Sequence, residues 1–243
     1  MSLAIIGGTG FGELGCLTVT HSHAVDTPFG QCSAPVEEGE LNGRLVFFLS
    51  RHGSLQTPIP PHLINYRANV WALRELGATR VLAVNAVGGI DPLARTGSLV
   101  VPHQLIDYSW GREHTFDDGS TGSLMHVDFT EPFEHSLRHA VLTAAQRSGH
   151  ECIDGSVVGV TQGPRLETAA EIERLRRDGC QLVGMTSMPE AALAREAGIA
   201  YASICMVVNA APGVDGSSVD HSDIRTVLND ATQRVASLLA FIE

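Results

Sequence analysis

The sequence predicts an α/β fold in one domain, because short apolar segments alternate with longer amphipathic segments along nearly its whole length. The chain has 243 residues, a length that suits one domain, and 44% of them are hydrophobic, which suffices for a large core. No internal repeat, low-complexity tract or linker divides the sequence. We therefore expect residues 1–243 to form a single domain around a mostly buried sheet.

In the first half of the chain, three apolar segments are expected to be strands and one amphipathic segment a helix. The strands cover Leu3–Ile6, Leu45–Leu49 and Val81–Val87, and each is followed by a turn that contains glycine. The helix covers Asn65–Leu76, where apolar residues recur at helical spacing. It is expected to stop at Gly77, because glycine is the residue that most often ends a helix.

The second half of the chain continues the alternation. The expected elements are a helix over Glu134–Ser148, a strand over Val157–Thr161, helices over Thr168–Arg177 and Pro189–Ala197, a strand over Tyr201–Val208 and a closing helix over Ser222–Phe241. The helix over Pro189–Ala197 has proline in its first turn and is followed by Gly198, which are typical start and stop signals. The segments Gly111–Gly122 and Pro212–Asp220 are expected to be long loops, which often line the sites of compact enzymes.

The charged residues exclude several classes of protein. The formal net charge of −11 opposes general nucleic-acid binding, because affinity for the phosphate backbone comes from clustered cations. All 16 cationic residues are arginine. The absence of lysine excludes a P-loop and also Schiff-base or pyridoxal-phosphate chemistry. An anionic substrate must therefore be held by arginine, histidine, hydroxyl groups or backbone N–H groups.

The expected location is the cytoplasm. No apolar run approaches the roughly 20 residues of a membrane-spanning helix, so no membrane partner is expected. The first ten residues, MSLAIIGGTG, lack the basic start of a signal peptide. Five cysteines are scattered along the chain without a CxxC pair, and their odd number favours a reduced compartment.

Two interpretations compete for the first glycine-rich segment. Gly10–Gly15 matches GxGxxG, but a dinucleotide site needs a helix directly after it, and Cys16–Thr20 alternates like a strand. We therefore favour a phosphate nest at Gly7–Gly10, made of backbone N–H groups and the Thr9 hydroxyl. An ordinary glycine turn is the alternative.

Polar groups follow two other predicted strands. Arg51 offers a forked donor to an oxyanion and His52 a further hydrogen bond, although a surface loop with incidental charge explains them as well. The segment Asn85–Gly89 ends an apolar strand, where ligands bind in α/β sheets and glycine lets a flat ligand approach the backbone. A tight turn after the strand is the alternative.

Three further positions are candidates beside helices and strand ends. Thr186 and Ser187 precede a helix N-terminus, which is a natural anion site, and Ser187 can also cap that helix. Glu167 stands where a loop meets a helix, and its other interpretation is a favourable charge in the first turn. Asn209 ends an apolar strand, where asparagine is also a common turn residue.

No metal site is expected from the histidines. Positions 62, 103, 114, 126 and 221 lack the HxxxH or HxH spacing that would fix two ligands together. His21 and His23 form an HxH, but on a short segment expected to be an exposed strand.

Seven of these segments, taken in order, resemble the trimeric purine nucleoside phosphorylases, and among them the methylthioadenosine and methylthioinosine phosphorylases. The segments are GGTG, RHG, NYRANVWAL, NAVGG, TQGPRLET, GMTSMPEAALARE and GIAYASICMVVN. The resemblance runs from Ile5 to the last helix. It implies a mixed, partly barrel-like β-sheet flanked by helices, a homotrimer or a dimer of trimers, and inorganic phosphate as co-substrate with no metal or organic cofactor.

The resemblance also implies roles for individual residues. It assigns phosphate binding to Thr9, Arg51, His52, the backbone at Ala86, and Thr186. It assigns nucleoside binding to Gly88, Leu166, Glu167, Met185, Asn209 and His221, with Met185 covering the ribose. His126 is implied to reach into the site of a neighbouring subunit. Arg51, His52 and Asn209 are implied to be the catalytic residues.

Hydrogen-bond matching at the base and at the 5′ position of the sugar predicts the preferred substrate. Asparagine at 209 can donate to N7 or O6, and a carboxylate at 167 accepts from the N1–H that 6-oxopurines carry, so inosine and guanosine are the expected substrates. His221 would hydrogen-bond a 5′-hydroxyl; if it is instead an exposed histidine beside Asp220 and Asp223, S-methyl-5′-thioinosine stays open. A non-catalytic nucleotide-binding protein and a Rossmann oxidoreductase are the distant alternatives.

Overall fold

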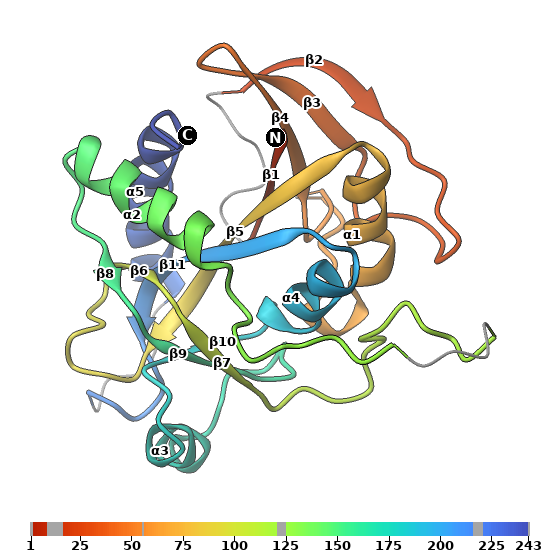
Figure 1. Ribbon diagram of the computed structural model, residues 1–243. Helices are drawn as coiled ribbons and strands as arrows, with labels where there is room; N and C mark the ends of the chain where they lie inside the picture. Colours follow the sequence, from red (N-terminus) through yellow and green to blue (C-terminus); the bar gives the residue numbers. More distant parts are fainter. Residues whose placement is uncertain (1, 9–16, 55, 121–124, 216–220, 243) are drawn as a thin grey trace.

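Strand β5 (Ala78–Gly89) lies at the centre of the sheet in the computed structural model, which describes residues 2–8, 17–54, 56–120, 125–215 and 221–242 (Figure 1). Strand β1 (Ser2–Gly7) runs parallel to its first half, and β11 (Ala200–Ala210) runs parallel to it along most of its length. Strand β10 (Leu182–Gly184) pairs antiparallel with Gly88 and Gly89 at its end. The long central strand thus joins the two halves of the sheet.

The described residues contain eleven strands in one mixed sheet. The order along its main path is β2-β3-β4-β1-β5-β10-β9-β7, while β11 pairs with β5 and β6, and β6 pairs with β8. The remaining strands are β2 (Thr18–His23), β3 (Val36–Leu41), β4 (Arg44–Ser50), β6 (Leu99–Val101), β7 (Gln104–Asp107), β8 (Ile153–Asp154) and β9 (Val157–Val160).

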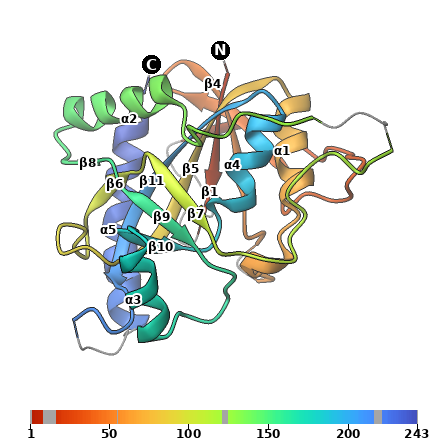
Figure 2. The ribbon, with the colours of Figure 1, turned by 60° about the horizontal axis from the view of Figure 1, so that its bottom comes forward.

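Helices cover the sheet on two sides (Figure 2). Helices α1 (Tyr66–Glu75) and α4 (Ser187–Glu196) share one hydrophobic core with the sheet, and α2 (His135–Arg147) and α5 (His221–Leu239) share another. Side chains of one strand alternate between these cores, as expected for period-2 geometry. In β1, for example, Ala4 and Ile6 belong to the first core, and Leu3 and Ile5 to the second.

Local sequence fixes the helix ends. Asn65 caps α1 by accepting from the backbone N–H of Ala68, and Glu134 caps α2 in the same way. Helix α3 (Ala169–Arg177) begins with a reciprocal capping box between Thr168 and Glu171. Among the described residues, no helix is both long and apolar enough to cross a membrane.

The predicted single α/β domain with a mixed sheet is confirmed, and each predicted helix and strand occurs with ends shifted by at most a few residues. The strand-like alternation expected after Cys16 is also present, as β2. Sequence analysis did not predict β3, β6, β7, β8 and β10. The predicted loops at 111–122 and 212–220 contain no regular element among their described residues.

Candidate active site

A cavity of about 200 Å³ lies where β1, β4, β5 and β11 end and where β10 leads into α4. Strands β1, β4, β5 and β11 run parallel, so their carboxyl ends meet at one edge, which is where α/β sheets bind ligands. The cavity brings together most of the predicted site residues: Arg51, His52, Ala86, Gly88, Leu166, Glu167, Met185, Thr186 and Asn209.

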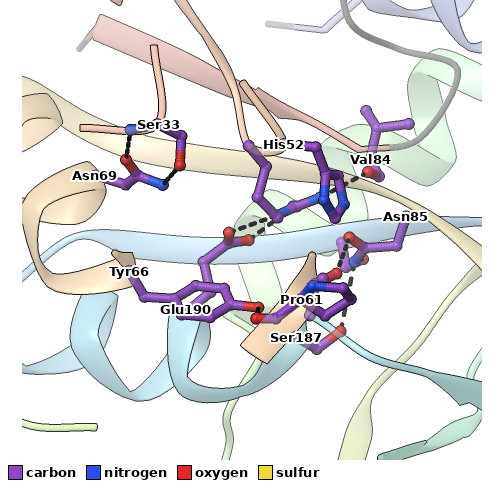
Figure 3. Close-up of polar contacts among 12 residues, drawn as sticks. Ser33, His52, Pro61, Tyr66, Asn69, Val84, Asn85, Ser187 and Glu190 are labelled. Carbon is purple, nitrogen blue, oxygen red and sulfur yellow. Dashed lines mark hydrogen bonds and ion pairs between the residues drawn. The ribbon is translucent and has the colours of Figure 1, made fainter. Parts of the chain in front are cut away.

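Arg51 borders the cavity from a fully buried position, held by Glu190 of α4. Its Nε and Nη2 atoms donate to the two carboxylate oxygens of Glu190 at 2.7 and 2.9 Å (Figure 3). Tyr201 donates its hydroxyl to the same carboxylate at 2.8 Å. Burial lowers the pKa of Arg51, but the charge and hydrogen bonds of Glu190, together with Tyr201 and Tyr66, outweigh burial and raise it. The guanidinium is therefore a fixed, permanently charged donor.

Glycine at position 8 permits this arrangement. A Cβ atom there would lie 2.6 Å from the carbonyl oxygen of Val84 and 2.9 Å from Nη1 of Arg51. Nη1 itself donates to the Val84 carbonyl at 3.3 Å. The backbone after β1 can approach Arg51 and β5 only because no side chain is present.

His52 is oriented by the backbone. Its Nδ1 donates to the carbonyl of Ile59 at 2.8 Å, so in the neutral ring Nε2 is an acceptor. Burial, and next the charge of Arg51, lower the pKa of His52 below its usual 6.5. Sequence analysis expected His52 to donate a further hydrogen bond to an oxyanion, whereas the neutral ring uses its Nδ1–H on Ile59 and leaves a lone pair on Nε2.

Asn85 organises the turn that starts α4. Its amide donates to Ser187 at 3.4 Å (Figure 3) and to Ser203 at 2.7 Å. Its oxygen accepts from the Thr186 hydroxyl at 3.2 Å. Capping of α4 by Ser187, one of the two roles considered for that residue, is wrong: Thr186 is the N-cap residue, and its side chain makes no capping bond. The hydroxyl of Ser187 is instead part of the Asn85 network.

Glu167 stands between this cavity and a larger one of about 450 Å³, because it lines both. It is 7% exposed, and its Oε1 accepts from the Thr161 hydroxyl at 2.5 Å. Asn209 is partly buried and donates one amide hydrogen to the carbonyl of Ala210 at 2.6 Å. The second hydrogen on that nitrogen is left for another acceptor.

Apolar side chains line the rest of the first cavity. Pro61, Pro212, Ile224 and Leu228 contribute to its wall. Ile224 and Leu228 lie one turn apart near the start of α5. This is the helix where sequence analysis expected His221 to meet the 5′ end of the sugar.

The structure does not place three of the predicted site residues in the cavity, because two of them are not described and the third lies elsewhere. Thr9 lies outside the described residues, as does the Gly10–Gly15 motif, and nothing is described of the side chain of His221. His126 is exposed on the loop between β7 and α2, which extends away from the sheet in Figure 1, and it does not line the cavity. Their predicted roles stay predictions.

Arg112 is a residue that sequence analysis missed. Its Nη1 donates to the carbonyls of Met185 and Met188 at 2.7 and 2.6 Å. Its Nη2 donates to the carbonyls of Gln162 and Thr161 at 2.8 and 3.2 Å. One side chain thus ties together the two loops that carry Glu167 and Met185.

Sequence analysis also missed Glu190, and the sequence holds a signal for Glu190 but none for Arg112. A buried arginine after an apolar strand requires a carboxylate, and Glu190 was the carboxylate of the GMTSMPE segment, so a signal for Glu190 existed. Arg112 bonds mainly to backbone carbonyls, which leave no mark in the sequence. Among the described residues, no group of three or more histidines, cysteines or acidic residues is placed to hold a metal.

Comparisons with known proteins agree on one family. The model of the phosphorylase superfamily matches residues 2–242. A probable S-methyl-5′-thioinosine phosphorylase of Pseudomonas syringae pv. tomato is 47% identical over 237 residues, covering 98% of this chain and 96% of that protein. The 6-oxopurine nucleoside phosphorylase of Pyrococcus furiosus is 39% identical over 242 residues, covering 98% and 90%.

The fold has a solved counterpart. The structure of methylthioadenosine phosphorylase from Schistosoma mansoni in complex with adenine superimposes with a TM-score of 0.93 at 32% identity. The match covers 100% of this chain and 90% of that one. It therefore extends over the whole sheet and its helices.

Proposed function

The chain belongs to the phosphorylase superfamily and is a purine nucleoside phosphorylase, and we propose that its substrate is S-methyl-5′-thioinosine. The products would be hypoxanthine and S-methyl-5-thioribose 1-phosphate. Sequence analysis favoured inosine and guanosine and kept this substrate as the alternative. Relatives named as probable S-methyl-5′-thioinosine phosphorylases, at 47–49% identity, favour the alternative over 6-oxopurine nucleoside phosphorylases at 39–40%.

The apolar wall at the start of α5 carries this proposal. Ile224 and Leu228 reach the cavity from α5, the helix that begins with His221, which sequence analysis expected at the 5′ end of the sugar. A methylthio group gains free energy from such a wall, at roughly 0.8 kcal/mol for each buried methylene equivalent. A 5′-hydroxyl placed there without a partner would instead lose its hydrogen bonds to water.

Phosphate would bind at the opposite end, between Gly8 and Thr186. Glu190 occupies the Nε side of the Arg51 guanidinium, so hydrogens on Nη1 and Nη2 remain for the anion. His52 in its neutral form accepts at Nε2, which suits an oxygen of phosphate that keeps its proton. Together these residues would hold the nucleophile in line with C1′.

The reaction then requires charge stabilisation at the base. An oxygen of phosphate forms a bond to C1′ while the bond from C1′ to N9 breaks, and the electron pair of that bond stays on the purine. Asn209 would donate to N7 or O6, where negative charge develops. Glu167 would accept from N1–H, which hypoxanthine has and adenine lacks, so adenine would leave it facing a lone pair.

Assembly, location and cofactor use belong to the same proposal. A homotrimer, or a dimer of trimers, would let His126 on its extended loop reach a neighbour's cavity. Phosphate would be the only co-substrate, with no metal and no organic cofactor. The protein would work in the cytoplasm.

A substrate panel tests the proposal. S-methyl-5′-thioinosine, inosine, guanosine, S-methyl-5′-thioadenosine and adenosine are each incubated with and without phosphate, and base release is measured as kcat/KM. We expect phosphate-dependent release of hypoxanthine, fastest from S-methyl-5′-thioinosine. A higher kcat/KM for inosine would return the assignment to ordinary 6-oxopurine nucleosides, and absence of phosphate dependence would refute a phosphorylase.

One pair of variants tests the apolar wall directly. Ile224→Thr should lower the preference for S-methyl-5′-thioinosine over inosine by about tenfold or more, because it replaces an ethyl group of the wall by a hydroxyl, and loss of even one methylene contact in a hydrophobic pocket changes discrimination by this order. Leu93→Thr is the control, since Leu93 is exposed and outside the cavity. An unchanged preference in Ile224→Thr would remove α5 from the 5′ site.

A further inference from the structure

We propose that Thr161 is a positioning residue that fixes Glu167 as a hydrogen-bond acceptor and thereby sets the preference for 6-oxopurines over 6-aminopurines. The inference rests on the proposed function, because it assumes that Glu167 faces N1 of the base. Thr161 itself lines the larger neighbouring cavity and not the one that would hold the nucleoside. It would therefore act on the base only through Glu167.

The position of Thr161 is set by the sheet. It directly follows β9, and its backbone N–H donates to the carbonyl of Gly184 at 2.8 Å, continuing the pairing of β9 with β10. Its side chain is β-branched, which restricts it to few rotamers. The hydroxyl therefore stays where the strand places it.

The Thr161 hydroxyl has two possible acceptors at different distances. Oε1 of Glu167 lies 2.5 Å away, whereas the carbonyl of Gly184 lies 3.4 Å away. A hydroxyl has one hydrogen, and a carboxylate at the shorter distance is the stronger acceptor. Within the part of the chain that the structure describes, no other side chain donates to Glu167. Thr161 thus occupies Oε1, and Oε2 is the oxygen left for the base.

This contact acts on the two base classes in opposite ways. A hydroxyl that donates to Oε1 uses Glu167 as a hydrogen-bond acceptor. An acceptor at this position matches the N1–H of a 6-oxopurine. A 6-aminopurine presents a lone pair at N1 and would need a donor there, whereas the hydrogen bond from Thr161 holds Glu167 as an acceptor. The neighbouring hydroxyl therefore adds to the discrimination that Glu167 provides alone.

Thr161→Val is the direct test, because valine has nearly the same shape and lacks the hydroxyl. The probes are S-methyl-5′-thioinosine and S-methyl-5′-thioadenosine, which differ in the purine alone. We expect the ratio of kcat/KM, 6-amino over 6-oxo, to rise about tenfold, since the free energy by which a hydrogen bond to a charged group exceeds a neutral one corresponds to about this factor in an equilibrium constant. Thr161→Ser should restore the wild-type ratio.

Two comparisons separate this role from a structural one. In a Glu167→Gln background, Thr161→Val should leave the ratio nearly unchanged, because the residue acts through the carboxylate. Gln162→Ala, which alters the same neighbouring cavity without touching Glu167, should change both substrates alike. If Thr161→Val does not fold, Thr161→Cys, a weaker donor of similar size, should give an intermediate ratio.

The outcomes also separate this inference from the proposed function. A wild-type protein that releases no base in a phosphate-dependent way refutes the proposed function. A wild type that cleaves S-methyl-5′-thioinosine, with the same ratio in the valine or cysteine variant, overturns the role of Thr161 alone. An equal effect of Thr161→Val with and without the Glu167 carboxylate also overturns it.

Discussion

Arg51 and Glu190 are separated by 139 positions in the sequence and form a fully buried ion pair beside the cavity. Removing one partner of such a pair leaves an uncompensated buried charge, which costs about 3–5 kcal/mol. Glu190→Ala should therefore lower the free energy of unfolding by this amount and raise the KM for phosphate. Urea denaturation and phosphate titration measure the two effects.

The matched control for this pair is Glu173, whose partners Arg176 and Arg177 are exposed. Exposed pairs contribute about 0–1 kcal/mol, so Glu173→Ala should change neither quantity much. A normal KM for phosphate in folded Glu190→Ala would show that Arg51 does not need its partner to bind the anion.

His52 links the site to pH. Burial and the charge of Arg51 hold its pKa below 6.5 in the folded protein, so the unfolded chain binds a proton more readily. The stability that His52 contributes is complete above pH 6.5 and is lost as the pH falls below that value. His52→Asn, whose amide can replace the Nδ1–H bond to Ile59, should lose less free energy of unfolding between pH 7 and pH 5 than wild type.

Denaturant unfolding at several pH values measures this difference. His139→Asn, at an exposed position of α2, shows what removal of any one imidazole does. Parallel pH curves for wild type and His52→Asn would contradict the assignment of this pH dependence to His52.

At the scale of elements, Arg112 connects the loop that begins after β7 to the loops that follow β9 and β10. Its four backbone acceptors lie in segments that carry Glu167 and Met185. Arg112→Ala should lower kcat/KM on the order of 100-fold, the loss that a shift of about 1 Å in positioning groups produces. The control is Glu113→Ala, at a 73% exposed neighbour in the same loop.

Activity of Arg112→Ala within about twofold of the Glu113→Ala value, far short of the loss expected from misplaced groups, would argue that the loops hold their shape unaided. Hydrogen exchange at the backbone around Met185 gives a second measurement. Faster exchange there is expected only in the arginine variant.

The elements also show how far the sequence alone could lead. Apolar runs and caps predicted β1, β4, β5, β11 and all five helices, because burial and end signals are local. Strands such as β10, three residues long, depend on the partners they meet, and β3 has the sequence VEEGEL, whose pairing with β2 and β4 decides its conformation. Because ligands bind at the carboxyl ends of parallel strands, the predicted strand ends indicated many of the residues that line the cavity. The contacts of Arg112 with backbone carbonyls could not be predicted, because they depend on no particular side chain.

For the whole molecule, the question is whether one chain forms a complete site. Arg51, Glu167 and Asn209 come from one chain and line one cavity, whereas His126 is exposed on an extended loop. Two large apolar side chains between β7 and α2 are also exposed, Trp110 at 72% and Met125 at 62%. The homotrimer proposed above would bring a neighbouring subunit against this loop and cover these side chains.

Mixed oligomers of two variants test a shared site. His126→Ala and Asn209→Ala should each be weakly active alone, since each lacks one required group in every site. After mixing in denaturant and joint refolding, a site with Asn209 from one chain and His126 from its neighbour is intact. In a closed ring with random, equal mixing, about a quarter of the sites combine both groups, so about a quarter of wild-type activity should return. Each variant refolded alone is the control, and size-exclusion chromatography verifies that mixed oligomers formed. No gain above the controls in verified mixed oligomers would mean that His126 serves its own chain or no site at all.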